Sequence, residues 1–259
     1  MRVMDAVVMA AGIPREGEPL FELTQGRSKA LLPVAGKMMV QWVLDALGAA
    51  RGVDRAVVVG PEGGLAFARE LHYVANQGEY LDNLLAGAHR LLELDPRARR
   101  LLVISADIPA ITSEHIDWVT RQAEESDDDF YYCVIDRQAM ESSFPGCRRT
   151  FFRLRDREVC GGDLAVVRTS VFDTEAGVWQ RLSAARKSRW RMAAVIGPSV
   201  LLRFLLGRLT VQQAERLASR RLGVRGRALN CPFPEVGMDV DKPFQLDLVE
   251  AALRRRGAA

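Results

Sequence analysis

Two distant stretches of this sequence carry residue types that bind phosphate groups and divalent cations. In the first, an apolar run over residues 6–9 ends in the small residues Ala10-Ala11-Gly12, whose backbone a nucleotide can approach because no large side chain stands in the way. In the second, the lone carboxylate Asp107 follows an apolar run over residues 101–104 and suits a hard cation. Together they predict a site that binds a nucleoside triphosphate through backbone, lysine and magnesium.

Lysines after the first stretch supply positive charge. A triphosphate carries about four negative charges near neutral pH, so it needs donors and cations around it. Lys29 and Lys37 provide ammonium groups, and Lys29 directly precedes Ala-Leu-Leu-Pro-Val, where a loop returns to packed structure. We therefore assign Lys29 a phosphate-binding role rather than a solvated position on the surface.

A further pair of carboxylates lies toward the end of the sequence. Asp239 and Asp241 are two residues apart, which places both on the same side of an extended segment just before a helix. Asp107 is either an N-cap or turn aspartate or a ligand at the carboxyl edge of a sheet, where open α/β folds bind ligands. Magnesium needs only one or two protein carboxylates, so either Asp239 or Asp241 could complete a metal site with Asp107.

Alternating strand and helix patterns predict the scaffold that positions these residues. Strands are expected at residues 4–10, 56–59, 71–74, 101–105, 130–135 and 236–240. Helices are expected at residues 38–50, 81–94, 113–126, 180–224 and 243–255. Residues 148–168 alternate like an antiparallel pair with a turn near Asp156. The pattern predicts a Rossmann-like, three-layer α/β/α fold with a mostly parallel, mixed sheet.

Composition favours one large domain over residues 1–259, with a helical, arginine-rich insertion at about 178–224. The 36 lysines and arginines exceed the 33 acidic residues by only three, too few to propose a nucleic-acid partner. The four cysteines lack C-x-x-C spacing, and no apolar signal segment opens the sequence. We expect reduced thiols and a cytoplasmic protein.

Two later segments have open interpretations. The apolar stretch Val195 to Leu209 is broken by charged residues, so it does not predict a membrane span; it is either a helix packed on the core or an apolar lip for weak contact with a lipid-linked substrate. The basic run around Lys187 is either a solvated helix end or a clamp for the phosphate of a second substrate.

Four segments resemble one known family. Val8-Met9-Ala10-Ala11-Gly12 resembles its opening L-A-A-G, and residues 29–37 resemble K-x-L-L-P-v-x-G-K-P. Ser105-Ala106-Asp107-Ile108-Pro109 is similar to G-D-x-P, and Asp239-Val240-Asp241-Lys242-Pro243 to D-x-D/N-T-P. In this order they resemble the nucleotidyltransferase family with a glycosyltransferase-A-like fold. The family includes molybdenum cofactor guanylyltransferase, sugar-1-phosphate nucleotidylyltransferases and the cytidylyltransferase of the methylerythritol phosphate pathway.

The resemblance implies magnesium-dependent transfer of a nucleoside monophosphate from a triphosphate to a phosphorylated small molecule or cofactor precursor, with release of pyrophosphate. It implies that the backbone of Ala10-Ala11-Gly12 contacts base and pyrophosphate, that Lys29 binds phosphate, and that Asp107 and Asp241 hold Mg²⁺. The chemistry is an in-line displacement at the α-phosphorus, in which the protein positions reactants and neutralises charge. GTP or CTP is slightly favoured.

The resemblance also implies softer assignments on both sides of the site. Gly78 and Asn83 resemble a base-contacting loop and helix, and Gly161-Gly162-Asp163 resembles an acceptor-side turn. The loop over residues 13–28 departs from the family, because it is longer than the usual G-x-R-M clamp and acidic in its middle. Arg15 or Arg27 would have to replace the usual arginine, and the loop could act as a lid that orders over the triphosphate.

Two other functions fit parts of the pattern. A glycosyltransferase on the same scaffold would use an Asp-x-Asp motif at the end of the fourth strand, yet only Asp107 stands there. A non-catalytic nucleotide-binding or sensor module would fit if the altered 13–28 loop fails to grip the phosphates. The sequence leaves the base, the acceptor and the oligomeric state open.

Overall fold

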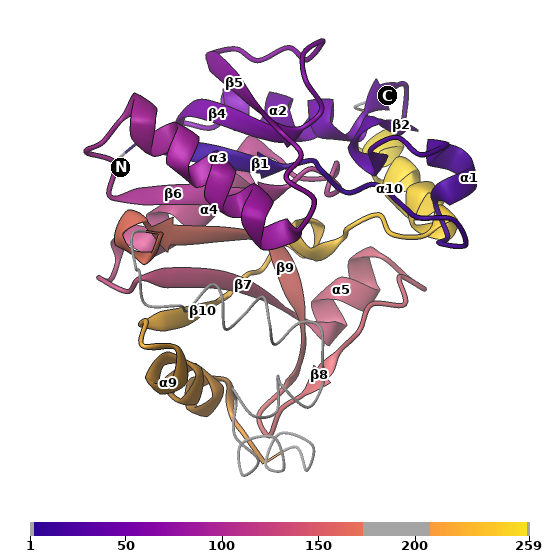
Figure 1. The fold of residues 1–259 in the computed structure, drawn as a ribbon. Helices are drawn as coiled ribbons and strands as arrows, with labels where there is room; N and C mark the ends of the chain where they lie inside the picture. The colour runs from indigo at the N-terminus through magenta and orange to yellow at the C-terminus, as the bar shows by residue number, and fades with distance from the viewer. Residues whose placement is uncertain (1–2, 173–207, 258–259) are drawn as a thin grey trace.

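A mixed β-sheet forms the centre of the computed structural model, which describes residues 3–172 and 208–257 (Figure 1). In sheet order the main strands are β10 (Gly226–Asn230), β7 (Phe130–Asp136), β9 (Glu158–Arg168), β6 (Arg100–Ser105), β1 (Met4–Met9), β4 (Val53–Gly60) and β5 (Glu70–Ala75). The neighbours of β1 run parallel to it, whereas β9 runs antiparallel to both β6 and β7. The predicted mixed, mostly parallel sheet is confirmed.

Helices cover both faces of this sheet and complete three layers. The helices are α2 (Met39–Ala49), α3 (Tyr80–Leu94), α4 (Ser113–Glu124), α5 (Arg137–Ser143), α9 (Val211–Leu222), α10 (Pro243–Arg255) and the short α1 (Phe21–Thr24). Val7 and Val59 pack with α3 on one face, whereas Val8 packs in the cluster that contains α2, α4 and α10 on the other. Because β1 is buried on both faces, it is a continuous apolar run from Ala6 to Met9 instead of alternating, and its one charged residue, the buried Asp5, pairs with Arg55.

The antiparallel part of the sheet forms the second half of the fold. The short strand β8 (Phe152–Arg153) pairs with the start of β9, so the predicted hairpin with a turn near Asp156 is confirmed. The sequence patterns did not predict α5 or β10. The predicted strand at 236–240 is wrong, because residues Pro234–Gly237 form a 3₁₀ turn with a proline at its start, and residues 238–241 follow without pairing in the sheet.

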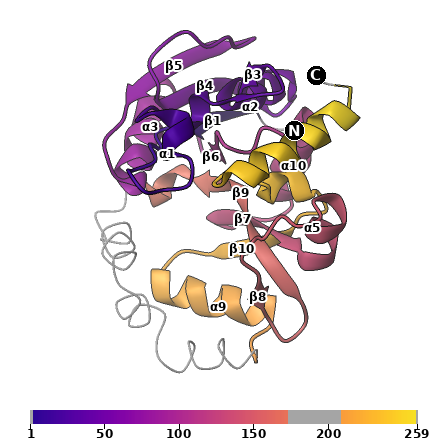
Figure 2. The same cartoon turned by 90° about the vertical axis from the view of Figure 1, so that its right-hand side faces the viewer.

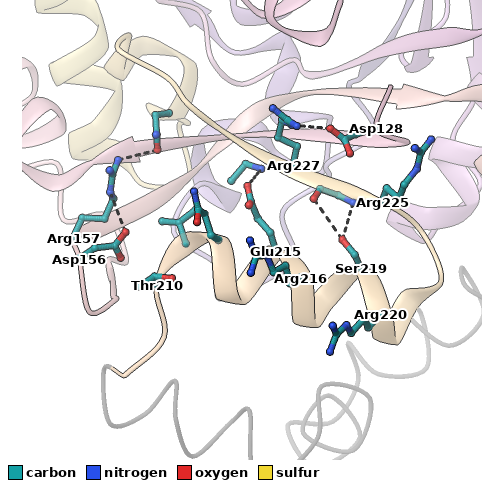
Figure 3. A pocket seen from close by; sticks show the side chains of 15 residues that line it. Asp128, Asp156, Arg157, Thr210, Glu215, Arg216, Ser219, Arg220, Arg225 and Arg227 are labelled. Atoms are coloured by element: carbon teal, nitrogen blue, oxygen red, sulfur yellow. Dashed lines mark hydrogen bonds and ion pairs between the residues drawn. The ribbon is translucent and has the colours of Figure 1, made fainter. Parts of the chain in front are cut away.

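Helix α9 covers the outer edge of β10, the last strand on that side of the sheet. The Ser219 hydroxyl accepts the backbone N–H of Gly226 at 2.9 Å, and the Glu215 carboxylate accepts that of Ala228 (Figure 3). These side chains occupy backbone donors that would otherwise face solvent along an open edge. The groove beside α9 holds about 830 Å³, and several of its charged side chains form ion pairs, as Arg227 does with Asp128.

Much of the predicted arginine-rich helical insertion lies outside the described residues. The part of that segment that the structure describes contains α9, which is capped at its C-terminus by Gly223 in a left-handed conformation. The four cysteines are buried and free, in agreement with the expected thiols. No helix within residues 3–172 and 208–257 combines the length and apolar character that a membrane span requires.

Candidate nucleotide and metal site

The predicted residues gather where β1 and β6 end and the segment before α10 passes beside them. The backbone N–H of Ala106 donates to the carbonyl of Met9 at 3.0 Å, and that of Val240 donates to the carbonyl of Asp107 at 3.0 Å. The 13–28 loop with α1, helix α10 and helix α5 surround this edge, which faces the viewer in Figure 2. The chain therefore brings residues from its beginning, middle and end to one place.

Lys29 lies between two of the predicted carboxylates. Its Nζ is 2.6 Å from Oδ2 of Asp107, contacts Oδ1 of Asp241, and donates to the carbonyl of Val240 at 3.3 Å. Burial alone would lower the pKa of Lys29, but the charges of Asp107 and Asp241 outweigh it and raise that pKa above its ordinary value. Lys29 is therefore a fixed positive charge at all physiological pH values.

The turn that carries Lys29 is tied to the small-residue loop. The N–H of Lys29 donates to the carbonyl of Gly12 at 2.9 Å, and the buried Ser28 hydroxyl donates to the carbonyl of Ala10. Ser28 also caps the 3₁₀ turn Lys29–Leu31 by accepting the N–H of Ala30 at 3.2 Å. A β-carbon at Gly12 would lie 3.3 Å from Cε of Lys29, so glycine leaves room for the lysine stem.

Gly60, at the end of β4, determines the path of that loop. Its φ is +129°, and a β-carbon there would lie 2.8 Å from backbone atoms of Ala10 and Ala11. This is closer than real contacts allow, and the atoms it would meet are backbone rather than a flexible side chain. Gly60 thus permits the close approach of β4 to the nucleotide loop, a role that the strand pattern did not reveal.

Gly78 and Asn83 belong to a hydrogen-bonded loop that reaches Ala11. Asn83 is buried, accepts the N–H of Gln77 at 2.7 Å and donates to Oδ1 of Asn76 at 3.1 Å. Asn76 also accepts the N–H of Gly78 at 2.8 Å and donates to the carbonyl of Ala11 at 3.3 Å. The buried Asn83 amide thus shapes this loop, while Gly78 is exposed with a φ of +94°.

A second cation, Arg149, joins the acceptor-side residues to the segment before α10. Its Nη1 contacts Oδ1 of Asp239, while its Nη2 lies 3.6 Å from Oδ2 of Asp163 and donates to the carbonyl of Gly161 at 3.1 Å. Only 16% of the Arg149 side chain is exposed. No sequence signal pointed to Arg149, because it precedes β8 in an irregular segment with no motif around it.

Asp239 and Asp241 face different cations, contrary to the expectation that both lie on one side. Asp239 contacts Arg149, whereas Asp241 contacts Lys29. The expectation assumed an extended segment, but the 3₁₀ turn over Pro234–Gly237 and the irregular backbone after it remove the two-residue alternation. Asp241 is also the more accessible of the two, with 56% of its side chain exposed against 13% for Asp239.

Asp163 is an unusual carboxylate within this cluster. Burial, aided by the negative charge of Asp107, raises the pKa of Asp163 to about 7, against the opposing effect of Arg149. On the neighbouring strand, burial and the charge of Asp163 raise the pKa of Tyr132 to about 12. A methyl group at Gly161 would collide with the Tyr132 hydroxyl, so a glycine at this position leaves the room that the Tyr132 ring needs.

Three predicted residues do not join the cluster. Lys37 pairs with Asp45 and lies over the ring of Trp42, so its ammonium is engaged on α2. Gly162 faces the core, where a β-carbon would lie 2.9 Å from that of Cys133. The Arg15 side chain is exposed and makes no ion pair within the described part of the chain.

Two of the sequence-based expectations fall on segments without a described structure. Lys187, with the basic run around it, lies outside the described residues. The same holds for most of the Val195 to Leu209 stretch. Both interpretations of each segment therefore stay predictions.

The loop over residues 13–28 is packed on the body of the protein. Leu20 and Thr24 are buried, and the N–H of Arg15 donates to the carboxylate of Glu18 at 2.8 Å to close a turn. Arg27, the other candidate for the usual arginine, is exposed two residues before Lys29. The additional residues of this loop therefore form a small folded unit with α1 at its centre.

The donor set fits a magnesium ion. Asp107 has one oxygen, Oδ1, that is buried without a hydrogen-bond partner among the described residues, while its other oxygen and Asp241 hold the Lys29 ammonium. Two carboxylates that converge on one cationic group can also converge on a metal ion. No cluster of three or more His, Cys, Asp or Glu ligands occurs in the described residues, but magnesium does not require one.

Comparisons with known proteins agree with this geometry. The family model described as "MobA-like NTP transferase domain" matches residues 6–176, more than half of the chain. A solved structure of a hypothetical transferase from Thermus thermophilus is 38% identical, covers 95% of this chain and 100% of its own, and superimposes with a TM-score of 0.82. A search of curated proteins finds no match.

More distant solved structures share the fold. CMP:2-keto-3-deoxy-manno-octonic acid synthetase complexed with CTP is 15% identical, covers 99% of this chain and all of its own, and gives a TM-score of 0.59. The 2-C-methyl-D-erythritol 4-phosphate cytidylyltransferase from Thermus thermophilus is 16% identical, covers 98% of this chain and all of its own, and gives a TM-score of 0.55. The fold is the glycosyltransferase-A-like fold of nucleotidyltransferases.

Proposed function

Because the chain belongs to the MobA-like NTP transferase family, we propose that it catalyses magnesium-dependent transfer of a nucleoside monophosphate from a nucleoside triphosphate to a phosphorylated small molecule. An oxygen of the acceptor phosphate attacks the α-phosphorus, the bond between the α-phosphorus and the bridging oxygen breaks, and pyrophosphate leaves. The observation that carries this proposal is the Lys29 ammonium held between Asp107 and Asp241.

Lys29 would bind the triphosphate once the carboxylates take a metal ion. Its long side chain allows the ammonium to leave the carboxylates and meet phosphate oxygens, while Gly12 and Ser28 keep the start of the stem in place. The backbone of Ala10 and Ala11 would receive the base and the phosphates, as the close packing of Gly60 beneath them supports.

Asp107 and Asp241 would hold Mg²⁺, which when bound would neutralise phosphate oxygens around the reacting phosphorus. The buried Oδ1 of Asp107, which has no hydrogen-bond partner in the described part of the chain, supports this role, because such an oxygen is costly unless a cation or donor meets it. The carboxylates and Lys29 otherwise act by position and charge. No side chain has to form a covalent bond with the substrate.

Asp163 and the carbonyl of Gly161 would face the acceptor from β9, on the side away from the nucleotide loop. The nucleotide is GTP or CTP in this proposal, and CTP has added support from two structural neighbours whose names include CTP or a cytidylyl group. The buried free cysteines support a reducing, cytoplasmic compartment.

The test is pyrophosphate release measured with each of the four common triphosphates and Mg²⁺ against a panel of phosphorylated sugars, polyols and cofactor precursors. We expect release above background with one pairing, and a loss of at least about 100-fold in Asp107→Asn, because the ion loses its buried ligand. Asp45→Asn, which removes a carboxylate outside the cluster, is the matched control and should keep full activity.

The same assay, extended by thermal melting with each triphosphate and by incubation with nucleotide sugars, separates the alternatives. Nucleotide binding that raises the melting temperature without turnover on any acceptor would favour a non-catalytic nucleotide sensor. Hydrolysis or transfer from a nucleotide sugar without pyrophosphate release would favour a glycosyltransferase, although β6, which ends at Ser105, is followed by the single carboxylate Asp107 rather than by an Asp-x-Asp pair.

A further inference from the structure

Among the described residues, two cationic side chains lie within the carboxylate cluster, and the second of them has no assigned role. Lys29 lies between Asp107 and Asp241, and Arg149 lies between Asp239 and Asp163. We propose that the guanidinium of Arg149 takes the place of a second divalent cation, an inference that rests on the function proposed above. Asp239 and Asp163 are then neutralised by the protein, and only Asp107 and Asp241 bind metal.

The contacts of Arg149 resemble those of a bridging ion. Its two terminal nitrogens reach carboxylates from separate parts of the chain, Asp239 before α10 and Asp163 on β9, as well as the carbonyl of Gly161. Enzymes that use two metal ions for phosphoryl transfer hold them about 3.5–4 Å apart between acidic residues. Here Lys29 and Arg149 hold two separate pairs of carboxylates, and a guanidinium, which stays protonated in proteins, occupies the second pair.

The balance of charge supports a single exchangeable cation. Among the described residues, Asp107, Asp163, Asp239 and Asp241 carry four negative charges when all are ionised, and three when Asp163 holds the proton that its raised pKa of about 7 allows, against two positive charges on Lys29 and Arg149. One or two negative charges therefore remain, and a single divalent ion is enough to neutralise them. Without Arg149 the remainder would be larger by one charge, and the buried carboxylate of Asp239 would lose the cation that it contacts.

The solvent exposure of the carboxylates also supports a single metal ion, bound by Asp107 and Asp241. Asp239 has only 13% of its side chain exposed and is already in contact with Arg149, whereas Asp241 is largely exposed and held by the flexible end of a lysine. An incoming ion can therefore displace Lys29 from Asp241 more easily than it can displace a buried fork-shaped group from Asp239. Arg149 is a positioning residue in this scheme, since it acts through the carboxylates that it holds.

Titration with Mn²⁺ alone, followed by electron paramagnetic resonance of the free ion, tests the assignment. The wild-type chain should bind one Mn²⁺, and Arg149→Gln should bind a second. The double variant Arg149→Gln/Asp239→Asn should return to one, because the vacated carboxylate is gone. Arg149→Lys keeps the charge and should stay at one ion; a second ion in Arg149→Gln that is absent in Arg149→Lys is the result that a purely structural role of the arginine would not produce.

The outcomes separate this proposal from the function on which it rests. If the wild-type chain binds no Mn²⁺, or if Asp107→Asn binds it as well as the wild type does, the proposed metal site fails. If Asp107→Asn loses the ion but Arg149→Gln still binds only one with unchanged affinity, the role of Arg149 fails alone.

A second comparison decides the question if Arg149→Gln does not fold. Asp239→Asn should leave Mn²⁺ affinity unchanged, because Asp239 is not a ligand, whereas Asp241→Asn should weaken it at least about tenfold. Weakening by Asp239→Asn to the same extent would overturn the proposal.

Discussion

At the scale of a single residue, Asp163 connects the ion pairs of the cluster with the pH dependence of the protein's stability. Its carboxylate shares Arg149 with Asp239, yet burial still raises its pKa to about 7. The group is thus close to half ionised at neutral pH, and the folded state holds a proton that the unfolded chain releases. This difference makes the stability of the protein depend on pH at one identifiable position.

We therefore predict that Asp163→Asn changes the pH profile of stability. Between about pH 4 and pH 7 the folded protein binds more protons at Asp163 than the unfolded chain, so its free energy of unfolding falls as the pH rises. The variant lacks this loss and should be more stable than the wild type at pH 8 by about 1–2 kcal/mol, after allowance for solvent screening at a partly exposed group. The two should converge near pH 4.

Urea denaturation at a series of pH values measures this difference. Asp82→Asn, which removes an exposed carboxylate on α3, serves as the control for loss of charge alone. Profiles for wild type and Asp163→Asn that run parallel from pH 4 to pH 8 would contradict the prediction.

Single residues of the site were predictable where they belong to a contiguous motif. Lys29, Asp107 and Asp241 were expected to meet, and the structure brings them into contact. Arg149 and Ser28 were not expected, because their importance arises from contacts with residues far along the chain rather than from their neighbours in sequence. A side chain can therefore pair with a motif residue while its own neighbours in the sequence form no motif.

At the scale of elements, the nucleotide loop depends on how closely β4 approaches the end of β1. The N–H of Ala10 donates to the carbonyl of Val59 at 2.9 Å, and Gly60 then passes beneath Ala10 and Ala11. The backbone that would receive a nucleotide is therefore supported by a neighbouring strand rather than by its own turn.

Gly60→Ala should displace this loop. The added methyl meets backbone at 2.8 Å and sits on a residue with a φ of +129°, so the loop must move. We expect the Kd for the triphosphate to rise at least about tenfold while the chain still folds, since each misplaced phosphate contact costs on the order of 1 kcal/mol.

Calorimetric titration with nucleotide measures the effect, and Gly63→Ala is the matched control. Gly63 also has a positive φ, +84°, but a β-carbon there meets nothing within 4 Å. Equal weakening by the two alanine variants would show that backbone strain, and not collision with the loop, governs binding, and an unchanged Kd for Gly60→Ala would contradict the prediction.

Helices and strands were predicted best where the periodic pattern of apolar residues is uninterrupted. The pattern over 243–255 predicted α10 with the bounds that the structure gives, because proline at its first turn marks the start clearly. The short strand β10 and the 3₁₀ turn at 234–237 were missed or misassigned, since four or five residues contain too little periodicity to distinguish extended from turned backbone.

At the scale of the whole molecule, the sheet ends in the two edge strands β5 and β10, and α9 protects the second of them. Its Glu215 and Ser219 accept backbone donors of β10 that face away from β7. An uncovered strand of this kind offers a template for pairing with another chain.

Replacing both side chains, as Glu215→Ala/Ser219→Ala, should therefore promote self-association. We expect a concentration-dependent rise in particle mass, measured by light scattering, with little change in the site about Lys29. Gln212→Ala, at an exposed position of the same helix, is the control for a change in helix surface. A double variant that stays at the mass of the wild type across all concentrations would refute the idea that α9 protects the edge.

Lys29 and Asp241 stand 212 positions apart, and this separation has a consequence for protein synthesis. The ribosome delivers the chain from its amino end, so β1, β4 and β6 can pair long before Asp241 emerges. During that interval Lys29 has Asp107 but lacks Asp241 as a partner, and the carbonyl of Asp107 has not yet met Val240. We expect a nascent chain stalled before Asp241 to pair β1, β4 and β6 but not to bind a nucleotide, so that activity begins only after Asp241 has been translated.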